Sequence, residues 1–478
     1  MSKNKLGSND FAFLPLLNFP NLEKLNLEEN HLSNAGTEFL SKSNFPKLKI
    51  LNLNHTKVNL EKLALLKFKT LEKLYLNNNK LEKAIDFLVK GCFDNLEVHK
   101  DSEGTLINDK LLKGLTKEIL ETDYLPNLKC LYLSGNHLHL YYKPLLKSKL
   151  FPKLTKLDMS NNELMINFVE DLIKIDNKLT GLDLSRNSFQ SSVIEVLVKM
   201  NNFHSLRNLY LTGCSLTDND MNIICFMKSL KIQKFKISFN EDIGSEGFRC
   251  LLKSKWIHNL KYLDIGSIGI NDEVVNEYFE SPGIKNTLEK LDIFSNNLST
   301  SLNGILGLNN LKKVVACNNK DEVIAEKIIN MDNLDKKVLY LWSCQVTPQV
   351  CKTIFDSPNM ARVIELYLND NFLGDEGAEV ICTCDYISNL SLLNLFHNEI
   401  RPNGFTYFAL TKCLPNLQEL NISENYPDED SINALVYNTN LTNLSILDLS
   451  TSEVSFINEF KDKVNSKHDW KFKIIFSN

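Results

Sequence analysis

The stretch VIELYLNDNFLGDEGAEVI, residues 363–381, decides the fold. In its first part, Leu366 and Leu368 are apolar and are separated by one residue, as in a short strand with one buried side. An asparagine, Asn371, follows at the point where the chain must turn away from the strand. The part from Gly374 onward has apolar residues at helical spacing. One strand and one helix cannot bury their own apolar sides, so the stretch predicts a stack of similar units.

The same phrase recurs along the whole chain, with apolar residues at its first, fourth and sixth positions and asparagine at its ninth. The clearer copies begin at Leu22, Leu71, Leu128, Leu154, Leu179, Leu288, Val363, Leu390 and Leu417. The weaker copies begin at Leu48, Leu96, Leu206, Ile232, Leu260, Leu311, Lys336 and Leu444. These 17 phrases follow one another at steps of 23 to 32 residues, a period typical of solenoids. We expect each phrase to form a strand and successive strands to stack in parallel.

The ninth-position asparagine predicts a ladder of buried amides, because an amide both donates to and accepts from backbone groups of its own and the adjacent repeat. Another residue stands at this position in five repeats, at Thr56, Cys214, Ile268, Cys344 and Ser452. We expect the ladder to be interrupted at those repeats.

Amphipathic segments between the phrases predict helices on the other side of the strands. Examples are AIDFLVK from Ala84, VIEVLVK from Val193, EVVNEYF from Glu273, EVIAEKI from Glu322 and EGAEVI from Glu376. The turns that begin SNAGTEFL at Ser33, GSEGFRCLL at Gly244 and GDEGAEVI at Gly374 are expected to supply the helix N-caps.

The phrase, its period and the DEGA-type turn at residues 375–378 resemble ribonuclease-inhibitor-type leucine-rich repeats, a family that includes Ran GTPase-activating proteins and the sensor arrays of innate receptors. The resemblance implies an α/β fold: a leucine-rich-repeat solenoid (horseshoe) of about 17 repeats, with parallel strands on the concave face and helices on the convex face. It implies little about function, because this scaffold hosts many roles.

The domain organisation follows from the range of the phrases. Residues 21–455 are predicted to form the solenoid, with an insertion near 99–125, where the step between phrases is longest. Residues 1–20 are expected to form an N-terminal cap and residues 456–478 a C-terminal cap, which includes a final strand in WKFKIIF from Trp470.

Composition excludes several classes of protein. The net charge of −5 argues against a broad surface for nucleic acid, and no apolar run is long enough to span a membrane or to act as a secretory signal. Eleven cysteines without CxxC pairs fit reduced thiols in a cytosol. We therefore expect a cytoplasmic protein that binds neither nucleic acid nor membrane.

The third, fifth and seventh positions of each phrase are predicted to face solvent on the strands. Five of them in the last third of the chain are aromatic and define the aromatic patch: Phe294, Tyr340, Trp342, Tyr367 and Phe396. Exposed clustered aromatics are the usual anchors of protein interfaces, so these residues are predicted to bind a partner. The alternative is that such rings only cover neighbouring side chains, as tyrosines at Tyr75, Tyr132 and Tyr210 would also do.

A charged surface is predicted on the same face. Lysines occupy the third position at Lys24, Lys73, Lys156, Lys234, Lys290 and Lys313. Acids occupy the fifth position at Asp158, Asp183, Asp264 and Asp292. Alternating signs favour cross-strand pairing and a self-neutralised face over a track for an acidic ligand.

The sequence contains no motif of an enzyme: there is no phosphate-binding GxxxxGK[ST] loop, no HExxH, no GxSxG and no zinc-spaced cysteine pair. Cys382 and Cys384, beside Asp385, are expected to be packing residues of an outer helix rather than catalytic thiols. His137 and His139 are expected to lie in a loop without a metal. No catalytic residue, metal or cofactor is predicted.

The function predicted from these observations is a protein–protein interaction scaffold that binds a protein partner through its concave face. The lysine- and asparagine-rich, arginine-poor chain resembles leucine-rich-repeat effectors that intracellular bacteria deliver into eukaryotic hosts, which would place it in the host cytosol. An amoeboid or other AT-rich eukaryotic source is equally compatible with this composition. The alternative is a GTPase-activating protein of the Ran type, for which Arg186 is the arginine placed beside a ladder residue, Asn187. The identity of the partner and the oligomeric state are left open.

Overall fold

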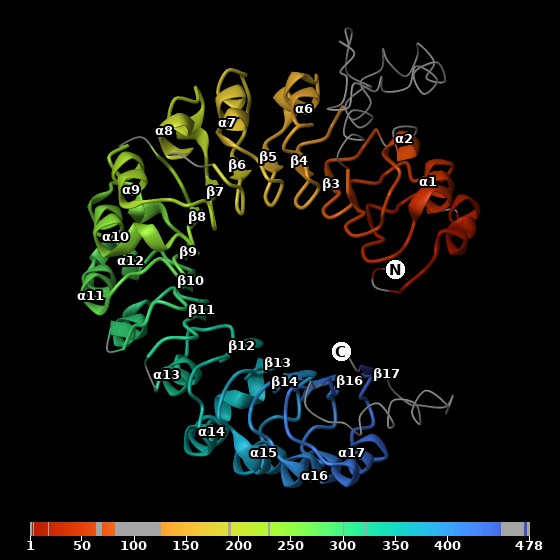
Figure 1. Cartoon of the computed structure of the whole chain (residues 1–478), viewed down its shortest axis with the longest axis vertical. Coiled ribbons are helices and arrows are strands. Elements are labelled where there is room, and N and C mark those ends of the chain that lie inside the picture. Colours follow the sequence, from red (N-terminus) through yellow and green to blue (C-terminus); the bar gives the residue numbers. More distant parts are fainter. Residues whose placement is uncertain are drawn as a thin grey trace. The chain divides into compact units, whose positions relative to one another are not determined.

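The computed structural model describes residues 2, 4–17, 19–63, 69–81, 126–189, 193–227, 230–299, 301–320, 323–450 and 473–475. It divides into two compact units, residues 1–259 and 260–478. Within each unit, short strands line one side and helices line the other (Figure 1). The strand side of each unit is called its strand face below.

The first unit contains a stack of parallel three-residue strands. These are β1 (Lys24–Asn26), β2 (Ile50–Asn52), β3 (Lys73–Tyr75), β4 (Cys130–Tyr132), β5 (Lys156–Asp158), β6 (Gly181–Asp183), β7 (Asn208–Tyr210) and β8 (Lys234–Lys236). Each strand pairs with the next in the same register, so that third positions lie beside third positions and fifth beside fifth.

The outer side of the first unit carries helices of four to ten residues. They are α1 (Ser33–Ser41), α2 (Leu60–Leu63), α6 (Lys143–Lys147), α7 (Ile166–Leu172), α8 (Val193–Leu197), α9 (Asp218–Cys225) and α10 (Gly244–Lys253). A 3-10 helix, η1 (Ser8–Leu16), precedes β1, and the backbone N–H of Leu6 donates to the amide of Asn30, the first ladder residue, at 3.0 Å. This segment therefore covers the first repeat.

The second unit contains two parallel sheets. The first has β9 (Tyr262–Asp264), β10 (Lys290–Asp292) and β11 (Lys313–Val315). The second has β12 (Val338–Tyr340), β13 (Glu365–Tyr367), β14 (Leu392–Asn394), β15 (Glu419–Asn421), β16 (Ile446–Asp448) and β17 (Lys473–Ile475). The pairing of β17 with β16 confirms the final strand predicted from WKFKIIF.

The outer helices of the second unit are α11 (Asp272–Glu280), α12 (Pro282–Lys285), α13 (Ile324–Asn330), α14 (Pro348–Phe355), α15 (Gly374–Thr383), α16 (Pro402–Leu410) and α17 (Glu429–Val436). A 3-10 helix, η7 (Ser301–Gly307), lies between β10 and β11 in the chain. The helices predicted from Val193, Glu273, Glu322 and Glu376 are confirmed, whereas the segment from Ala84 lies outside the described residues.

The core forms from the apolar positions of the phrase. Leu366 and Leu368, the fourth and sixth residues of the phrase that begins at Val363, are fully buried, and Val363 packs beside them with no exposed surface. The fifth residue between them, Tyr367, is only half-buried. The structure thus confirms the α/β leucine-rich-repeat solenoid predicted from the period-2 pattern.

Strand β3 pairs directly with β4, although the phrase that begins at Leu96 stands between them in the chain. That phrase, the predicted insertion near 99–125 and most of the predicted C-terminal cap lie outside the described residues.

The asparagine ladder has the expected chemistry. At Asn187 the side-chain oxygen accepts the backbone N–H groups of Asn162 and Leu164 in the preceding repeat, at 3.0 and 2.9 Å. Its amide nitrogen donates to the carbonyls of Met159, also in the preceding repeat, and of Leu184 in its own, at 3.0 and 2.8 Å. Each ladder asparagine thereby fixes two successive repeats to each other.

The expected interruption of the ladder is wrong for the bond to the following repeat, which is kept where asparagine is replaced. The backbone N–H groups of Thr56, Cys214, Ile268 and Cys344 still donate to the side-chain oxygen of the following ladder asparagine, at 2.9 to 3.1 Å. A substituted residue keeps its backbone donor and loses only the amide that would contact the preceding repeat. Ser452 lies outside the described residues.

The expected helix N-caps are also wrong at the three quoted turns. Helices α1, α10 and α15 have no side-chain cap at their N-termini, and their first residues, Ser33, Gly244 and Gly374, have positive φ angles. Backbone of the following repeat closes two of these turns, since Ser33 N–H donates to Thr56 O and Gly374 N–H to Asn398 O.

Side-chain capping occurs at other helices. Asn271 caps α11 and Asp428 caps α17 from within the same repeat. At α16 the cap comes from the preceding repeat, because Asp375 of α15 accepts the N–H groups of Arg401 and Gly404 at 2.8 and 2.9 Å. This bond also connects neighbouring repeats on their outer side.

The turn before each ladder position uses the left-handed backbone region. Glu29, Arg186 and Phe239 have φ angles of 54, 55 and 56° there, although none is glycine. Gly135 occupies the same position, and a Cβ atom on it would lie 2.0 Å from the Asn78 side-chain oxygen. A larger residue at Gly135 would therefore require the Asn78 side chain to move, although the backbone conformation itself is adopted by other residues in other repeats.

The Asn187→Ala substitution is expected to lower the free energy of unfolding by about 2–4 kcal/mol, because it leaves buried backbone donors and acceptors of two repeats without partners. Urea unfolding followed by far-ultraviolet circular dichroism measures the change. Asn167→Ala, at an exposed position of α7, is the control and should change the stability by no more than about 0.5 kcal/mol. Equal stability of the two variants would contradict the role of the ladder.

Candidate functional site

The strand face of the second unit carries the predicted aromatic patch. Tyr340 and Tyr367 stand at the fifth position of β12 and β13, and Phe294, Trp342 and Phe396 stand at the seventh position of the β10, β12 and β14 repeats. All five side chains are half-buried. They lie on the solvent side of the strands as predicted, but neighbouring side chains cover part of each ring.

Tyr340 and Tyr367 form a stacked pair. Strands β12 and β13 pair in register at these two residues, so their side chains stand about one strand spacing apart. Their ring centroids are 5.0 Å apart and their planes differ by 13°. The ammonium group of Lys313 lies 4.5 Å from the centroid of the Tyr340 ring. This cation–π contact adds a cation at the β11 side of the pair.

Phe294 and Trp342 form a second ring pair across an intervening repeat. Their centroids are 6.0 Å apart and their planes differ by 56°. The repeat between them has Cys317 at the same position, a small and fully buried side chain. Phe294 also lies over Gly266, where a Cβ atom would come within 2.3 Å of the ring. Two small residues therefore create the space in which these rings meet.

Phe396 stands apart from these two pairs. Asn369 occupies the seventh position between it and Trp342, and its ring contact within the described residues is with His397, at 6.0 Å. The imidazole Nδ1 of His397 is 3.2 Å from the carboxylate of Asp370. The structure thus brings four of the five predicted residues together as two pairs and leaves Phe396 at the edge.

The phenol of Tyr367 is held by an acid. Its hydroxyl donates to Oε2 of Glu365 at 3.3 Å. Burial, and then the negative charge of Glu365, raise the pKa of Tyr367 above its usual value. The phenol therefore stays protonated at neutral pH and remains a hydrogen-bond donor.

The sequence interpretation missed part of this surface. Val338, Leu392 and Ile446 occupy third positions on β12, β14 and β16 and are half-buried, while Glu365 and Glu419 occupy the same position on the strands between them. A signal was present, because earlier repeats carry lysine at this position. The change from lysine to apolar and acidic residues marks the same part of the chain as the aromatic patch.

The strand face of the first unit also contains aromatic rings. Tyr75 and Tyr132 stack with centroids 4.2 Å apart and planes 6° apart. The next two fifth positions are Asp158 and Asp183, which are register partners on β5 and β6. Stacked tyrosines are therefore not unique to the aromatic patch, and the first pair serves as a natural comparison for it.

The two carboxyl groups are poorly solvated. Burial, and then the charge of Asp183, raise the pKa of Asp158 to about 6, and burial also raises the pKa of Asp183. Asp158 accepts the N–H and hydroxyl of Ser160, at 2.9 and 2.6 Å. No lysine or arginine in the described part of the chain lies within ion-pair distance of either carboxylate.

The predicted pairing between third-position lysines and fifth-position acids is wrong for the lysines. None of the six forms an ion pair within the described residues. Ion pairs instead join second positions of adjacent repeats, where Glu23 binds Lys49 at 2.8 Å and Glu289 lies between Lys261 and Lys312, at 3.2 and 3.3 Å. Side chains at equal positions of adjacent strands are nearer than side chains two positions apart on the same strand.

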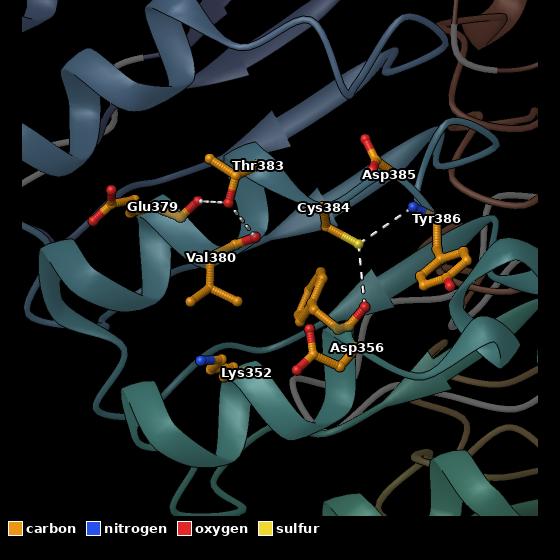
Figure 2. Close-up of a pocket in the computed structure, with 9 residues that line it drawn as sticks. Lys352, Asp356, Glu379, Val380, Thr383, Cys384, Asp385 and Tyr386 are labelled. Carbon is orange, nitrogen blue, oxygen red and sulfur yellow. Dashed lines mark hydrogen bonds between the residues drawn. The ribbon is translucent and has the colours of Figure 1, made fainter.

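A groove lies on the outer side of the second unit, between α14 and α15 (Figure 2). Its volume is about 530 Å³, and Lys352, Asp356, Glu379, Asp385 and Tyr386 line it with charged and polar groups. The thiol of Cys384 donates to the carbonyl of Phe355 at 3.3 Å and accepts the N–H of Tyr386 at 3.4 Å.

Cys384, which lines this groove, and Cys382 of α15 are both buried. Burial raises the pKa of the Cys384 thiol, and it raises that of Cys382 well above its usual value. A thiol is a nucleophile only when it is ionised. Both thiols are therefore protonated at neutral pH, in agreement with the packing role predicted for them.

The histidines and the arginine singled out in the sequence lie in the first unit. His137 and His139 both face Glu163, with Nδ1 to carboxylate distances of 2.6 and 3.4 Å. No group of three or more metal-binding side chains occurs within the described ranges. Arg186 is exposed on the left-handed turn before Asn187, and its backbone N–H donates to Thr212 O at 2.7 Å.

No helix in the described ranges combines the length and the apolar character needed to cross a lipid bilayer.

Comparisons with known proteins agree with the repeat pattern. The family model for the leucine-rich repeat matches residues 363–382. No curated protein matches the chain by sequence.

Solved structures resemble the chain at low identity. A chain of the yeast Rad7 and Elc1 complex is 15% identical, with 77% of this chain and 79% of that chain covered and a TM-score of 0.47. An internalin, inlF, from Listeria monocytogenes is 16% identical, with 79% and 92% covered and a TM-score of 0.34. A chain of the TLR13–ssRNA13 complex is 20% identical, with 91% and 57% covered and a TM-score of 0.37.

The Asp158→Asn substitution is expected to stabilise the protein at pH 7.5 by about 1–3 kcal/mol. A carboxyl whose pKa is raised on folding opposes folding above that pKa, and the opposition fades as pH falls from about 6 toward the ordinary value of 3.8. Asparagine keeps the oxygen that accepts from Ser160. Urea midpoints at pH 7.5 and pH 4.0 measure the effect, which should be small at the lower pH.

The control for this experiment is Asp242→Asn, at an exposed position of the first unit, which should leave the midpoint unchanged at both pH values. A midpoint for Asp158→Asn below that of the wild type at pH 7.5 would show that the carboxylate stabilises the fold.

Proposed function

We propose that this leucine-rich-repeat solenoid is a protein-interaction scaffold whose partner binds the strand face of the second unit at the aromatic patch. The observation that carries the proposal is the pair of ring contacts, Tyr340 with Tyr367 and Phe294 with Trp342, on the solvent side of the strands. These rings do not fill the core, which is complete beneath them at Leu339 and Leu366. Large aromatic side chains in this situation are typical binding hot spots.

The rings are also held in place before a partner arrives. Stacking, the Lys313 contact and the bond from Tyr367 to Glu365 restrict four of the side chains. A restricted side chain loses little further entropy on binding, so the same contacts give a higher affinity.

Finer assignments belong to the same proposal. The ribonuclease-inhibitor type is supported by the outer helices of seven to ten residues, such as α13 to α17. A cytoplasmic location is supported by cysteines without CxxC pairs, and delivery into a host cytosol is an analogy with effectors of similar lysine-rich, arginine-poor composition. The Ran-type GTPase-activating alternative would use Arg186, which is exposed in the first unit, and it predicts activity that does not depend on the aromatic patch.

The Trp342→Ala, Tyr367→Ala double variant should bind its partner less tightly, with a binding free energy weaker by about 2–4 kcal/mol. Its circular dichroism spectrum should remain that of the wild type. The assay is a quantitative pull-down from eukaryotic cell lysate, followed by affinity measurement with the purified partner.

The matched control is Tyr75→Ala, Tyr132→Ala, which removes an equally stacked pair from the strand face of the first unit. It should retain the partner. Loss of the partner in this variant alone would move the site to the first unit. Absence of any partner for the wild type would favour the test of GTPase activation.

A further inference from the structure

The strand face over β12 to β16 differs in charge from the rest of the strand positions. Its third, fifth and seventh positions include Glu365, Glu419 and Asp448 but no lysine, arginine or histidine. The same positions on β1 to β11 include the lysine row described above. Between Lys313, which contacts the Tyr340 ring from β11, and Lys473, which follows Ile446 in the third-position row on β17, the strand face that holds Tyr340, Tyr367 and Trp342 is therefore apolar and acidic.

The third-position row on these strands alternates in character. The register places Val338, Glu365, Leu392, Glu419 and Ile446 side by side in this order. Adjacent strands are about 4.8 Å apart, so the two glutamates stand about 10 Å apart, and so do successive apolar residues. None of the three apolar side chains belongs to the fully buried core.

The acids of this surface have no cationic partner. Glu365 accepts only the Tyr367 hydroxyl, at 3.3 Å, and Asp448 accepts the N–H and hydroxyl of Ser450, at 3.0 and 2.6 Å. Within the described residues, no lysine or arginine lies within ion-pair distance of Glu365, Glu419 or Asp448. A neutral partner that covered them would remove water from charged groups without replacing it, which is costly.

We propose, on the basis of the function proposed above, that the partner presents an amphipathic helix with apolar and basic residues on one face. Lysine or arginine would neutralise Glu365 and Glu419, and the apolar residues would cover Val338, Leu392 and Ile446. Nucleic acid is disfavoured, because its phosphates would meet three carboxylates.

Helix geometry fits the spacing of the row. Residues seven apart on a helix are about 10.5 Å apart along its axis, close to the two-strand spacing of about 10 Å. Residues three or four apart on the helix are about 4.5–6 Å apart along its axis, close to the spacing of about 4.8 Å between adjacent strands. A helix lying along the third-position row would therefore alternate apolar and basic residues every three to four positions.

The probes are three synthetic 22-residue helical peptides with leucine at the apolar positions and either lysine, glutamate or serine at the alternating positions. Fluorescence anisotropy of the labelled peptides measures binding to the full chain. The leucine–lysine peptide should bind the wild type most tightly. Glu365→Gln with Glu419→Gln should weaken it about 10-fold or more at low salt, and the effect should shrink as salt screens the charges.

Two further variants sharpen the comparison. Glu376→Gln with Glu379→Gln, on the outer helix α15, makes the same change of net charge and should leave the affinity unchanged. Glu365→Lys with Glu419→Lys should reverse the preference in favour of the leucine–glutamate peptide. This reversal cannot result from loss of folding, because the variant must still bind.

The inference is overturned if the three peptides bind equally or if the leucine–lysine peptide does not bind. It is also overturned if that peptide binds the Glu365→Gln, Glu419→Gln variant as tightly as the wild type, or if single-stranded RNA competes for the site. The Trp342→Ala, Tyr367→Ala variant separates this result from the proposed function. If that variant weakens all three peptides and the glutamine variant weakens none, the aromatic site stands and the charge preference fails. If only the glutamine variant weakens binding, the aromatic site itself is wrong.

Discussion

The bond between a ladder asparagine and the preceding repeat is the interaction on which the rest of the structure depends. A three-residue strand makes few backbone bonds of its own, so its register could slip without a further constraint. The side chain of Asn187 joins backbone groups on both sides of the junction between two repeats and prevents such a slip. Because the register is constant within each sheet, equal positions of the phrase form continuous rows. The surfaces of the two strand faces are made of such rows.

The same bonds stabilise a turn that would otherwise be unfavourable. Residues such as Arg186 and Phe239 have φ angles of 55 and 56°, in a region that L-residues rarely adopt. The ladder bonds satisfy the backbone on either side of this turn, which offsets the conformational cost. One consequence is that the side chain before each ladder residue is directed outward. Phe239 is 52% exposed for this reason, although its neighbours Ile237 and Asn240 are buried.

The fold could be predicted from the sequence because its determinants are local. A period of two in the strand and an amide at a fixed position are visible in one phrase, as at Leu366, Leu368 and Asn371. The details that could not be predicted depend on distances across repeats. The backbone N–H of Cys214 keeps its ladder bond although the side chain is not asparagine. The ion pair between Lys261 and Glu289 joins second positions of the phrase in adjacent repeats. For the site, the aromatic positions were predictable, but the Phe294–Trp342 contact also requires a small residue at Cys317.

Core and surface positions of the phrase are therefore subject to different constraints. The fourth and sixth positions must pack into the core, so they remain apolar from Leu25 to Leu447, and the ninth position is asparagine in most repeats because of the ladder. The third, fifth and seventh positions lie between fixed points and can change without loss of the fold. Third positions carry lysine in many earlier repeats and acidic or apolar residues such as Glu365 and Leu392 in later ones, and the strands still pair at equal positions of the phrase. The specificity for a partner can thus be altered by substitutions on a single strand. Each new side chain stands at a fixed distance from the equivalent side chains of the adjacent strands.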